Sequence, residues 1–266
     1  MGTITKALEL LTFFSSNQSQ IGLTQFVKLS GRDKATVHRH LTELEQNGFL
    51  EQHPESRAYR LGPALLRLAA VREAGFPVRA LLRPVVEGLS EQVGELAHAS
   101  LLQGDALSPV IHADPRLHGT QVHFDPAEVL PLHATSSGLA LLAFADNALR
   151  ERVLSRPLSM HTGHTITDAA TLRRMIDDVR QTGISQLSGA FDEEVVSQGA
   201  PLFAEGGRVI GAMSIAVPRV RARPDRDAIL GRHLAEAARK ASLSLGAEVQ
   251  DLPPLFHAPV SKLPAD

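Results

Sequence analysis

The sequence predicts an α+β fold of two domains. An N-terminal winged helix-turn-helix is joined by a linker helix to a C-terminal α/β domain with an antiparallel sheet. Three observations lead to this prediction. Helical periodicity in the first 62 residues is broken by a glycine turn and ends in a short hairpin pattern. After residue 77, helical periods are intermixed with paired strand patterns. The chain of 266 residues is long enough for two domains.

These patterns also set the expected boundaries. Residues 1–62 form the winged helix-turn-helix, 63–76 the linker helix and 77–250 the larger domain. Residues 251–266 contain four prolines and are expected to form a flexible tail.

The composition is that of a globular protein without thiol chemistry. Hydrophobic residues make up 43% of the chain and charged residues 21%. The absence of cysteine excludes disulfides, thiolate metal sites and thiol catalysis. No apolar run approaches the roughly 18 residues that can span a bilayer. The N-terminus has a helical period instead of the layout of a signal peptide. We therefore expect a cytoplasmic protein with no membrane partner.

Charge is distributed unevenly along the chain. The net charge is −2, yet residues 1–40 hold five Lys or Arg against two Asp or Glu, and two histidines are added. The residues after 75 hold 18 basic against 22 acidic side chains. This mild asymmetry is consistent with a DNA-reading head on a neutral-to-acidic body.

The N-terminal segment has the apolar spacing of a helix. Ile4, Leu8 and Leu11, together with Ala7 and Phe14, lie on one stripe at about 100° per residue. This is the pattern of a helix with one packed face.

A second and a third helix follow, and a tight turn separates them. Leu23–Ser30 is the second helix, and Gly31 supplies the conformational freedom that the turn needs. The third helix covers Lys34–Asn47. Asp33 is its expected N-cap and Gly48 its expected C-terminal stop.

The third helix has one apolar and one cationic face. Val37, Leu41 and Leu44 share the inner face, and Arg39 points the opposite way. In a helix-turn-helix, this helix enters the major groove of DNA with its N-terminal residues at the base edges. The residues predicted to contact DNA here are Arg32, Lys34, Ala35, Thr36, His38 and Arg39. An ordinary solvent-exposed helix would also have a cationic outer face. The neighbouring elements therefore decide between this interpretation and DNA binding.

A hairpin after the third helix favours the DNA interpretation. Phe49–Glu51 and Arg57–Leu61 are strand-like, and a turn cluster lies between them. This is a wing, with Arg57 near its tip. Arg57 and Arg60 are expected to neutralise phosphates or to enter the minor groove. The alternative is a winged helix that binds only protein, and the outward-facing Arg39 and Arg57 favour DNA.

The second domain is expected to alternate helices and strands. The predicted helices, with the linker helix first, are 64–74, 78–93, 135–144, 147–154, 169–181 and 224–249. The predicted strands are 95–103, 106–113, 120–124, 184–187, 199–203 and 208–217. The first two strands flank Gly104-Asp105, a dipeptide favoured in hairpins.

One segment of this domain has the features of an anion-binding site. His133-Ala134-Thr135-Ser136-Ser137-Gly138 leads into an apolar helix. Free amides and hydroxyls at a helix N-terminus attract negative charge, and small side chains let a ligand approach. Ordinary capping by Thr135 or Ser136 explains the same residues, and the pattern alone favours that explanation.

Taken together, the motifs resemble the IclR family of bacterial transcriptional regulators. The matching segments are TVHRHLTELEQNGFL at 36–50, YRLGP at 59–63, LPLHATSSGLALLA at 130–143, FDEEVVSQGAPLF at 191–203 and GAMSIAVP at 211–218. They cover nearly the whole chain in the family's order. The resemblance implies a winged helix, a linker helix and an effector-binding domain that takes small metabolites, often organic acids. It also implies a homodimer or homotetramer.

The resemblance further implies which residues bind the effector. The loop before the apolar helix contributes Ala134, Thr135, Ser136, Ser137 and Gly138. Asp192, Ser214 and Ala216 complete the predicted pocket. Ala216 stands where some relatives place a second hydroxyl. That departure removes a donor and implies a less polar ligand or a different pose.

Other chemistries are weaker alternatives. His161 and His164 could ligate a metal, but no acidic pair lies nearby in the sequence. His98 and His112 are expected to sit on strands without chemistry. Ser136 or Ser137, His133 and Asp192 contain the residue types of a hydrolytic triad, but there is no G-x-S-x-G elbow or phosphate-cradling loop. We therefore expect no enzyme, no catalytic residue, no cofactor and no metal site.

The resulting hypothesis is a ligand-responsive transcriptional regulator. Its partners are a double-stranded DNA operator, a small-molecule effector that is an organic acid, and further copies of the chain. The alternatives left open are a small-molecule hydrolase and a metabolite sensor whose winged helix binds protein.

Overall fold

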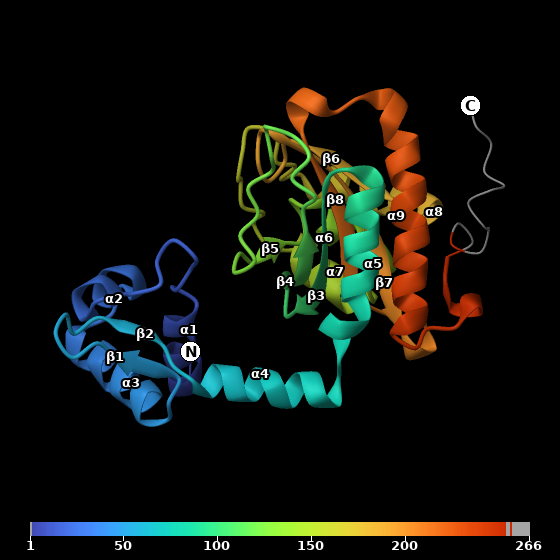
Figure 1. Ribbon diagram of the computed structural model, residues 1–266. Helices are drawn as coiled ribbons and strands as arrows, with labels where there is room; N and C mark the ends of the chain where they lie inside the picture. The colour runs from blue at the N-terminus through green and yellow to red at the C-terminus, as the bar shows by residue number, and fades with distance from the viewer. Residues whose placement is uncertain (1, 254–255, 257–266) are drawn as a thin grey trace. The chain divides into compact units, whose positions relative to one another are not determined.

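The computed structural model describes residues 2–253 and residue 256 (Figure 1). The chain divides into two compact units, Met1–Pro77 and Val78–Asp266. Within the described part of the chain, no helix is both long and apolar enough to cross a membrane.

The first unit is a helix-turn-helix with a wing. Its helices are α1 (Thr3–Leu11), α2 (Leu23–Ser30), α3 (Lys34–Gln46) and α4 (Ala64–Gly75), and its antiparallel strands are β1 (Leu50–Gln52) and β2 (Tyr59–Leu61). Gly31 ends α2 in the left-handed conformation, with a φ of 63°. Asp33 caps α3 by accepting from the amide of Thr36 at 2.8 Å. The predicted turn and N-cap are therefore confirmed.

Apolar residues from the helices and strands of this unit pack together in one core. The buried side chains are Leu10, Ile21, Phe26, Val37, Leu41, Leu44, Leu50 and Tyr59. The predicted inner face of α3 is thus confirmed, because Val37, Leu41 and Leu44 all belong to it.

The predicted packed stripe of α1 is confirmed only at its C-terminal end, where Leu11 and Phe14 pack against the core. Ile4 and Leu8 are 77% and 50% exposed, whereas Leu10 is fully buried. The physical reason is that α1 meets the core near its C-terminal end. Two groups of α1 accept hydrogen bonds from the guanidinium of Arg32. They are the carboxylate of Glu9 at 2.5 Å and the carbonyl oxygen of Lys6 at 3.3 Å.

The second unit is built around a six-stranded antiparallel sheet. Its strands are β3 (Leu96–Gln103), β4 (Ala106–Ala113), β5 (Leu130–Pro131), β6 (Ser185–Ser188), β7 (Val195–Ala204) and β8 (Arg208–Pro218). Their order across the sheet is β5-β4-β3-β8-β7-β6. The hairpin around Gly104 is confirmed, and Gly104 has a φ of 62°.

Helices cover both faces of this sheet (Figure 1). Helices α5 (Val78–Val93) and α9 (Pro224–Ser244) pack on one face through Ala97, Ala99, Met213, Ile215 and other apolar residues. Helices α6 (Ser136–Phe144), α7 (Asn147–Leu154) and α8 (Ala169–Thr182) form a second apolar cluster with the strand residues Leu107 and Ala212. The sheet is therefore the middle of three layers.

Several boundaries differ from the sequence-based expectation. Thr120–Phe124 is not a strand. A side chain contacts this segment instead of a neighbouring strand, because the guanidinium of Arg221 donates a hydrogen bond to the carbonyl oxygen of Thr120. The last helix ends at Ser244 instead of Val249, because the chain turns at Gly246 with a φ of 92°. The short strand β5 was not predicted.

The expectation of a flexible tail is wrong at its beginning. Leu252 and Phe256 are 4% and 1% exposed and belong to the apolar core under α5 and α9. Apolar burial therefore holds this part of the chain against the domain. Residues 254–255 and 257–266 of the predicted tail lie outside the described residues.

Candidate functional site

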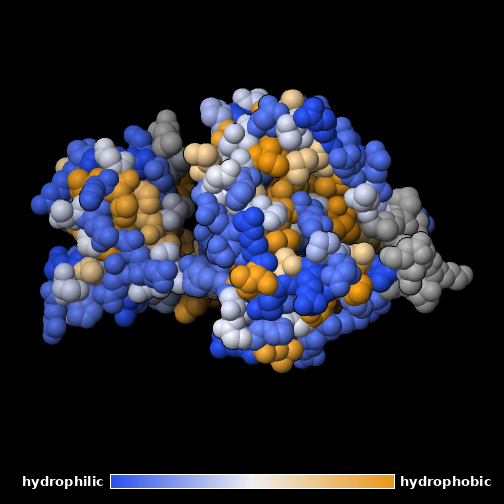
Figure 2. Space-filling view, turned by 90° about the horizontal axis from the view of Figure 1, so that it is seen from above, coloured by the Kyte–Doolittle hydropathy of each residue, from blue (hydrophilic) through white to orange (hydrophobic). Residues whose placement is uncertain are grey.

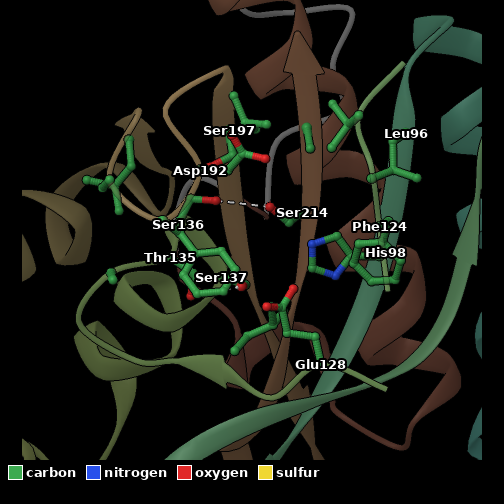
Figure 3. A pocket seen from close by; sticks show the side chains of 18 of the residues that line it. Leu96, His98, Phe124, Glu128, Thr135, Ser136, Ser137, Asp192, Ser197 and Ser214 are labelled. Atoms are coloured by element: carbon green, nitrogen blue, oxygen red, sulfur yellow. Dashed lines mark hydrogen bonds between the residues drawn. The ribbon is translucent and has the colours of Figure 1, made fainter. Parts of the chain in front are cut away.

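The second unit contains a cavity of about 500 Å³ between the sheet and the start of α6 (Figure 3). Two rows of neighbouring strand residues form its floor. In one row His98 lies opposite Ser214. In the next row Leu96 lies opposite Ala216, which lies opposite Ser197. Since residues in register share a face of a sheet, these side chains all point toward α6.

Glycines let α6 approach the sheet this closely. A Cβ atom on Gly199 of β7 would lie 2.5 Å from the carbonyl carbon of Ser136. A Cβ atom on Gly138 would lie 2.4 Å from the Cα atom of Leu132. At both positions the first turn of α6 therefore lies in direct contact with backbone atoms. A residue larger than glycine would push the helix and the contacting backbone apart.

Hydroxyl groups join the first turn of α6 to the floor of the cavity. Thr135 donates to the carbonyl of Pro131 at 2.8 Å and accepts from the amide of Gly138 at 3.1 Å. The Oγ atoms of Ser136 and Ser214 lie 3.0 Å apart. Ser214 donates to the carbonyl of Gln198 at 2.6 Å, so Ser136 is the donor of the pair. The amides of Ser136 and Ser137 precede the first intrahelical hydrogen bond and are the free donors of this turn.

Aromatic rings form one wall. His98 lies beside Phe124, with ring centroids 4.8 Å apart, and His112 lies 5.0 Å from the same phenyl ring. Burial, with a smaller contribution from His112, lowers the pKa of His98 to about 4. The imidazole of His98 is therefore neutral at physiological pH.

Two loops also contribute to the lining of the cavity. His161 lines the cavity and lies 5.1 Å from the ring of Phe191. Thr162 and Thr165 tie the loops together, since their hydroxyls donate to the carbonyls of Gly189 at 2.5 Å and Ala190 at 2.6 Å. Burial lowers the pKa of His161, and the neighbouring His133 lowers it further.

Acidic side chains are the charged groups at the cavity. Glu128 and Asp192 line it. Burial raises the pKa of Glu128, and repulsion from Asp125 and Asp192 adds to this, while His123 opposes it. No lysine or arginine occurs in the lining, as far as the structure describes the chain. An anion here would depend on neutral donors and on the helix N-terminus.

The structure brings most of the predicted effector residues together. Ala134, Thr135, Ser136, Ser137, Asp192, Ser214 and Ala216 all line the cavity. Gly138 does not, because its role is the close packing against Leu132.

Sequence reasoning missed several lining residues, including His98, Phe124, Glu128 and His161. His98 lies on β3, as expected, and its ring faces the cavity, which sequence reasoning did not predict. The alternation along β3 puts His98 and Ser100 on one face, but which face meets α6 is decided by strand pairing.

The geometry does not assemble the hydrolytic or metal alternatives. The Nε2 atom of His133 lies 2.8 Å from the carbonyl oxygen of Ser159, and Ser136 is bonded to Ser214 instead of to a base. Within the described ranges, no group of three or more His, Asp or Glu side chains is arranged to hold a metal ion.

In the first unit, the predicted DNA contacts fall into two groups. Lys34, Ala35, His38 and Arg39 of α3 are exposed, and so is Arg57, which stands in the wing turn with a φ of 58°. His38 and Arg57 also line a hollow of about 440 Å³ beside the start of α2.

The remaining predicted contacts are engaged within the unit. Thr36 is half-buried and its amide is capped by Asp33. Arg60 forms an exposed ion pair with Glu51 at 2.7 Å. The side chain of Arg32 is only 17% exposed and faces Glu9, so the structure does not place it with the α3 group.

Comparison with known proteins covers both units. The sequence profile of the bacterial transcriptional regulator IclR C-terminal domain matches residues 73–243, and that of the IclR helix-turn-helix domain matches residues 3–54. The chain is 30% identical to the HTH-type transcriptional regulator BhcR of Paracoccus denitrificans over 91% of this chain and 86% of the relative.

Solved structures give the same result. A putative IclR transcriptional regulator from Silicibacter sp. TM1040 matches with a TM-score of 0.86 and 42% identity, over 96% of this chain and 99% of that one. An IclR homolog from Microbacterium hydrocarbonoxydans, complexed with 4-hydroxybenzoate, matches with a TM-score of 0.75 and 26% identity, over 92% of this chain and 99% of that one.

Proposed function

The chain belongs to the IclR family of bacterial transcriptional regulators, and from this premise we propose that it senses a small organic acid in the cavity beside α6. The observation that carries the proposal is the first turn of α6, which brings free amides and small side chains to a cavity of about 500 Å³. A helix N-terminus of this kind favours a carboxylate. The homolog that was crystallised with 4-hydroxybenzoate supports acids, aromatic ones among them, as the ligand class.

A ligand screen tests this proposal. Purified protein is mixed with a panel of small carboxylates and aromatic acids, and the melting temperature is recorded. A ligand present at 100 times its Kd adds about 2.7 kcal/mol to the stability of the folded state. Calorimetric titration of the hits then gives their affinity. A panel of matched amides and amines serves as the control, and binding of amines in preference to acids would contradict the proposal.

We propose that the operator is read by α3 and the wing. Lys34, Ala35, His38 and Arg39 are exposed on α3, and Thr36 lies among them. Arg57 is the exposed wing cation without a carboxylate partner among the described contacts, whereas Arg60 is partly neutralised by Glu51. Arg32 holds α1 against α3 and supports the surface indirectly. Salt-sensitive binding to a specific DNA fragment would separate this function from that of a protein-binding head.

A homodimer or homotetramer is the proposed assembly. Apolar side chains are exposed on α1 at Ile4 and Leu8 and on α4 at Leu66 and Val71. Hydrophobic residues also reach the surface on the face displayed in Figure 2. A second copy of the chain is the proposed occupant of the α1 and α4 faces, because two heads can then read a pseudo-palindrome with half-sites about one helical turn apart. Sedimentation analysis of wild type against Leu66→Glu tests this assembly.

The effector is proposed to act by changing the separation or orientation of the heads through α4. Such a switch requires that the ligand bind one arrangement more tightly than the other. We expect the protein to work in the cytoplasm, where its operator lies. A chromogenic ester assay is the control for the hydrolase alternative, and turnover of the ester would favour that alternative.

A further inference from the structure

His98 is a buried polar side chain in the cavity that the proposed binding mode leaves unused. It is 6% exposed and lies in the middle of β3, between His112 on β4 and Ser214 on β8. Its ring reaches the cavity next to Phe124 (Figure 3). Such a position allows contact with a ligand but little contact with bulk water.

The hydrogen bond to Ser100 assigns the tautomer of this ring. Nδ1 of His98 lies 3.2 Å from Oγ of Ser100, and Ser100 is fully buried. No other hydrogen bond of the Ser100 hydroxyl occurs among the described residues. A buried hydroxyl that donates no hydrogen bond destabilises the folded protein. The hydroxyl therefore donates to Nδ1, and the ring proton resides on Nε2.

The Nε2–H group is a free donor. The hydrogen bonds of the described residues give it no protein partner. The low pKa of His98, about 4, keeps the ring uncharged at neutral pH. The imidazole therefore presents an uncharged N–H group to the cavity. The hydrogen bond with Ser100 and the contact with the Phe124 ring fix the orientation of this group.

Several hydroxyl donors of the cavity are already engaged. The hydroxyls of Thr135, Ser136 and Ser214 already donate to Pro131, Ser214 and Gln198. The hydroxyl of Ser197 and the rings of His123 and His161 also line the cavity and make no hydrogen bond among the described residues. Two further donors are the first amides of α6 and the Nε2–H group of His98. An oxygen-rich ligand would satisfy both, whereas an amine would satisfy neither.

We propose that His98 is a specificity-determining residue that donates its Nε2–H to an acceptor oxygen of the bound acid. The effector class is thereby narrowed to acids that present oxygen acceptors both to α6 and to β3. This inference rests on the proposed function, namely that the cavity beside α6 holds a small organic acid.

The binding test uses two matched variants. His98→Phe removes the donor and keeps an aromatic ring on β3. His112→Phe is the control, because His112 lies in the same strand row and contacts the same Phe124 ring, but is exposed and does not line the cavity. The probes are sodium acetate, pyruvate, benzoate and 4-hydroxybenzoate, titrated by calorimetry into the full-length protein.

For any probe that wild type binds, His98→Phe should weaken binding about tenfold or more, as loss of a hydrogen bond to a charged acceptor does. His112→Phe should change binding less than about twofold, as surface changes usually do. His98→Gln places an amide N–H near the position of Nε2 and should restore part of the affinity. A purely structural role of the ring would give no rescue by Gln.

A second measurement is independent of any ligand. Long-range ¹⁵N correlation spectra of the imidazole should show the Nε2–H tautomer in wild type and a mixture of tautomers in Ser100→Ala. An Nδ1–H tautomer in wild type would overturn the inference. If a probe binds and both Phe variants bind it alike, only the role of His98 is rejected. If no probe binds wild type, the small-acid proposal is rejected and this inference with it.

Discussion

Ser136 and Ser214 are hydrogen-bonded to each other at 3.0 Å, although 78 positions separate them in the chain. The bond joins the first turn of α6 to the middle of β8 and lies at the floor of the cavity. Any side chain that replaces Ser136 therefore acts on the cavity and on the helix–sheet contact together.

The first prediction concerns Ser136→Leu. The larger side chain should occupy ligand space and remove the hydroxyl that donates to Ser214, so affinity for an acid should fall. The winged helix-turn-helix has its own core, so operator binding should survive. We expect a regulator that binds DNA but no longer responds to ligand. Calorimetry and operator titrations with and without ligand provide the measurements. Wild-type ligand affinity in a folded variant would show that the ligand does not bind at the first turn of α6.

The second prediction concerns Gly199→Ala. The added methyl would meet backbone of Ser136 at 2.5 Å, and backbone cannot move as a flexible side chain does. Overpacking of this kind costs about 1–3 kcal/mol. Gly88→Ala is the matched control, since Gly88 is exposed in α5 and nothing lies within 4 Å of the added atom. The control should stabilise the protein by about 0.4–1 kcal/mol. Urea unfolding of the two variants measures both effects. Equal stabilities would show that α6 does not rest on β7 as described.

The third prediction concerns Arg39→Ala. If Arg39 contacts guanine in a bidentate manner, the variant should lose about 1–3 kcal/mol of specific binding. The melting temperature should hardly change, because the position is exposed. Arg67→Ala removes the same charge from α4, where the side chain is also exposed, and serves as the control. Fluorescence anisotropy with the native operator makes the comparison. Unchanged affinity of Arg39→Ala would remove this residue from the readout.

The fourth prediction separates the two wing arginines. Arg57→Ala should weaken binding to all sequences about equally and lower the salt slope by about one unit, as loss of one phosphate contact does. Arg60→Ala should have a smaller effect, because Glu51 already offsets its charge at 2.7 Å. Titrations at several salt concentrations on specific and random DNA measure both. A change of preferred sequence with an unaltered salt slope would assign base readout to Arg57 instead.

The fifth prediction concerns pH and His98. The folded protein lowers the pKa of this ring from 6.5 to about 4, so below pH 6.5 the unfolded chain binds more protons than the folded one. The contribution of His98 to stability is therefore complete above pH 6.5 and is lost as the pH falls toward 4. Protonation of His98 should lower the free energy of unfolding by roughly 3 kcal/mol at most. Denaturation of wild type and His98→Phe at pH 7.5 and pH 4.5 isolates this contribution, because the other titrating groups cancel. A pH dependence shared by both proteins would contradict it.

Local patterns in the sequence determined most of the elements. The apolar spacing of α3, the Asp33 cap and the glycine at position 31 each depend on neighbours within a few residues, and all appear as predicted. The hairpin at Gly104 followed from the same kind of local rule. At Thr135 and Ser136 the local pattern fits ordinary capping as well as ligand binding, and the family resemblance selected them as pocket residues.

Tertiary structure alone decided which face each element uses and what meets across the cavity. Helix α1 has several apolar residues, but only the contact with α3 makes Leu10 the buried one. His98 alternates with apolar residues on β3, and pairing with β8 turns it toward α6 beside Ser214. Likewise, the packing of Phe256 into the core depends on a surface built from α5 and α9. Periodicity fixes how side chains alternate within one element, whereas burial depends on partners that lie far away along the chain.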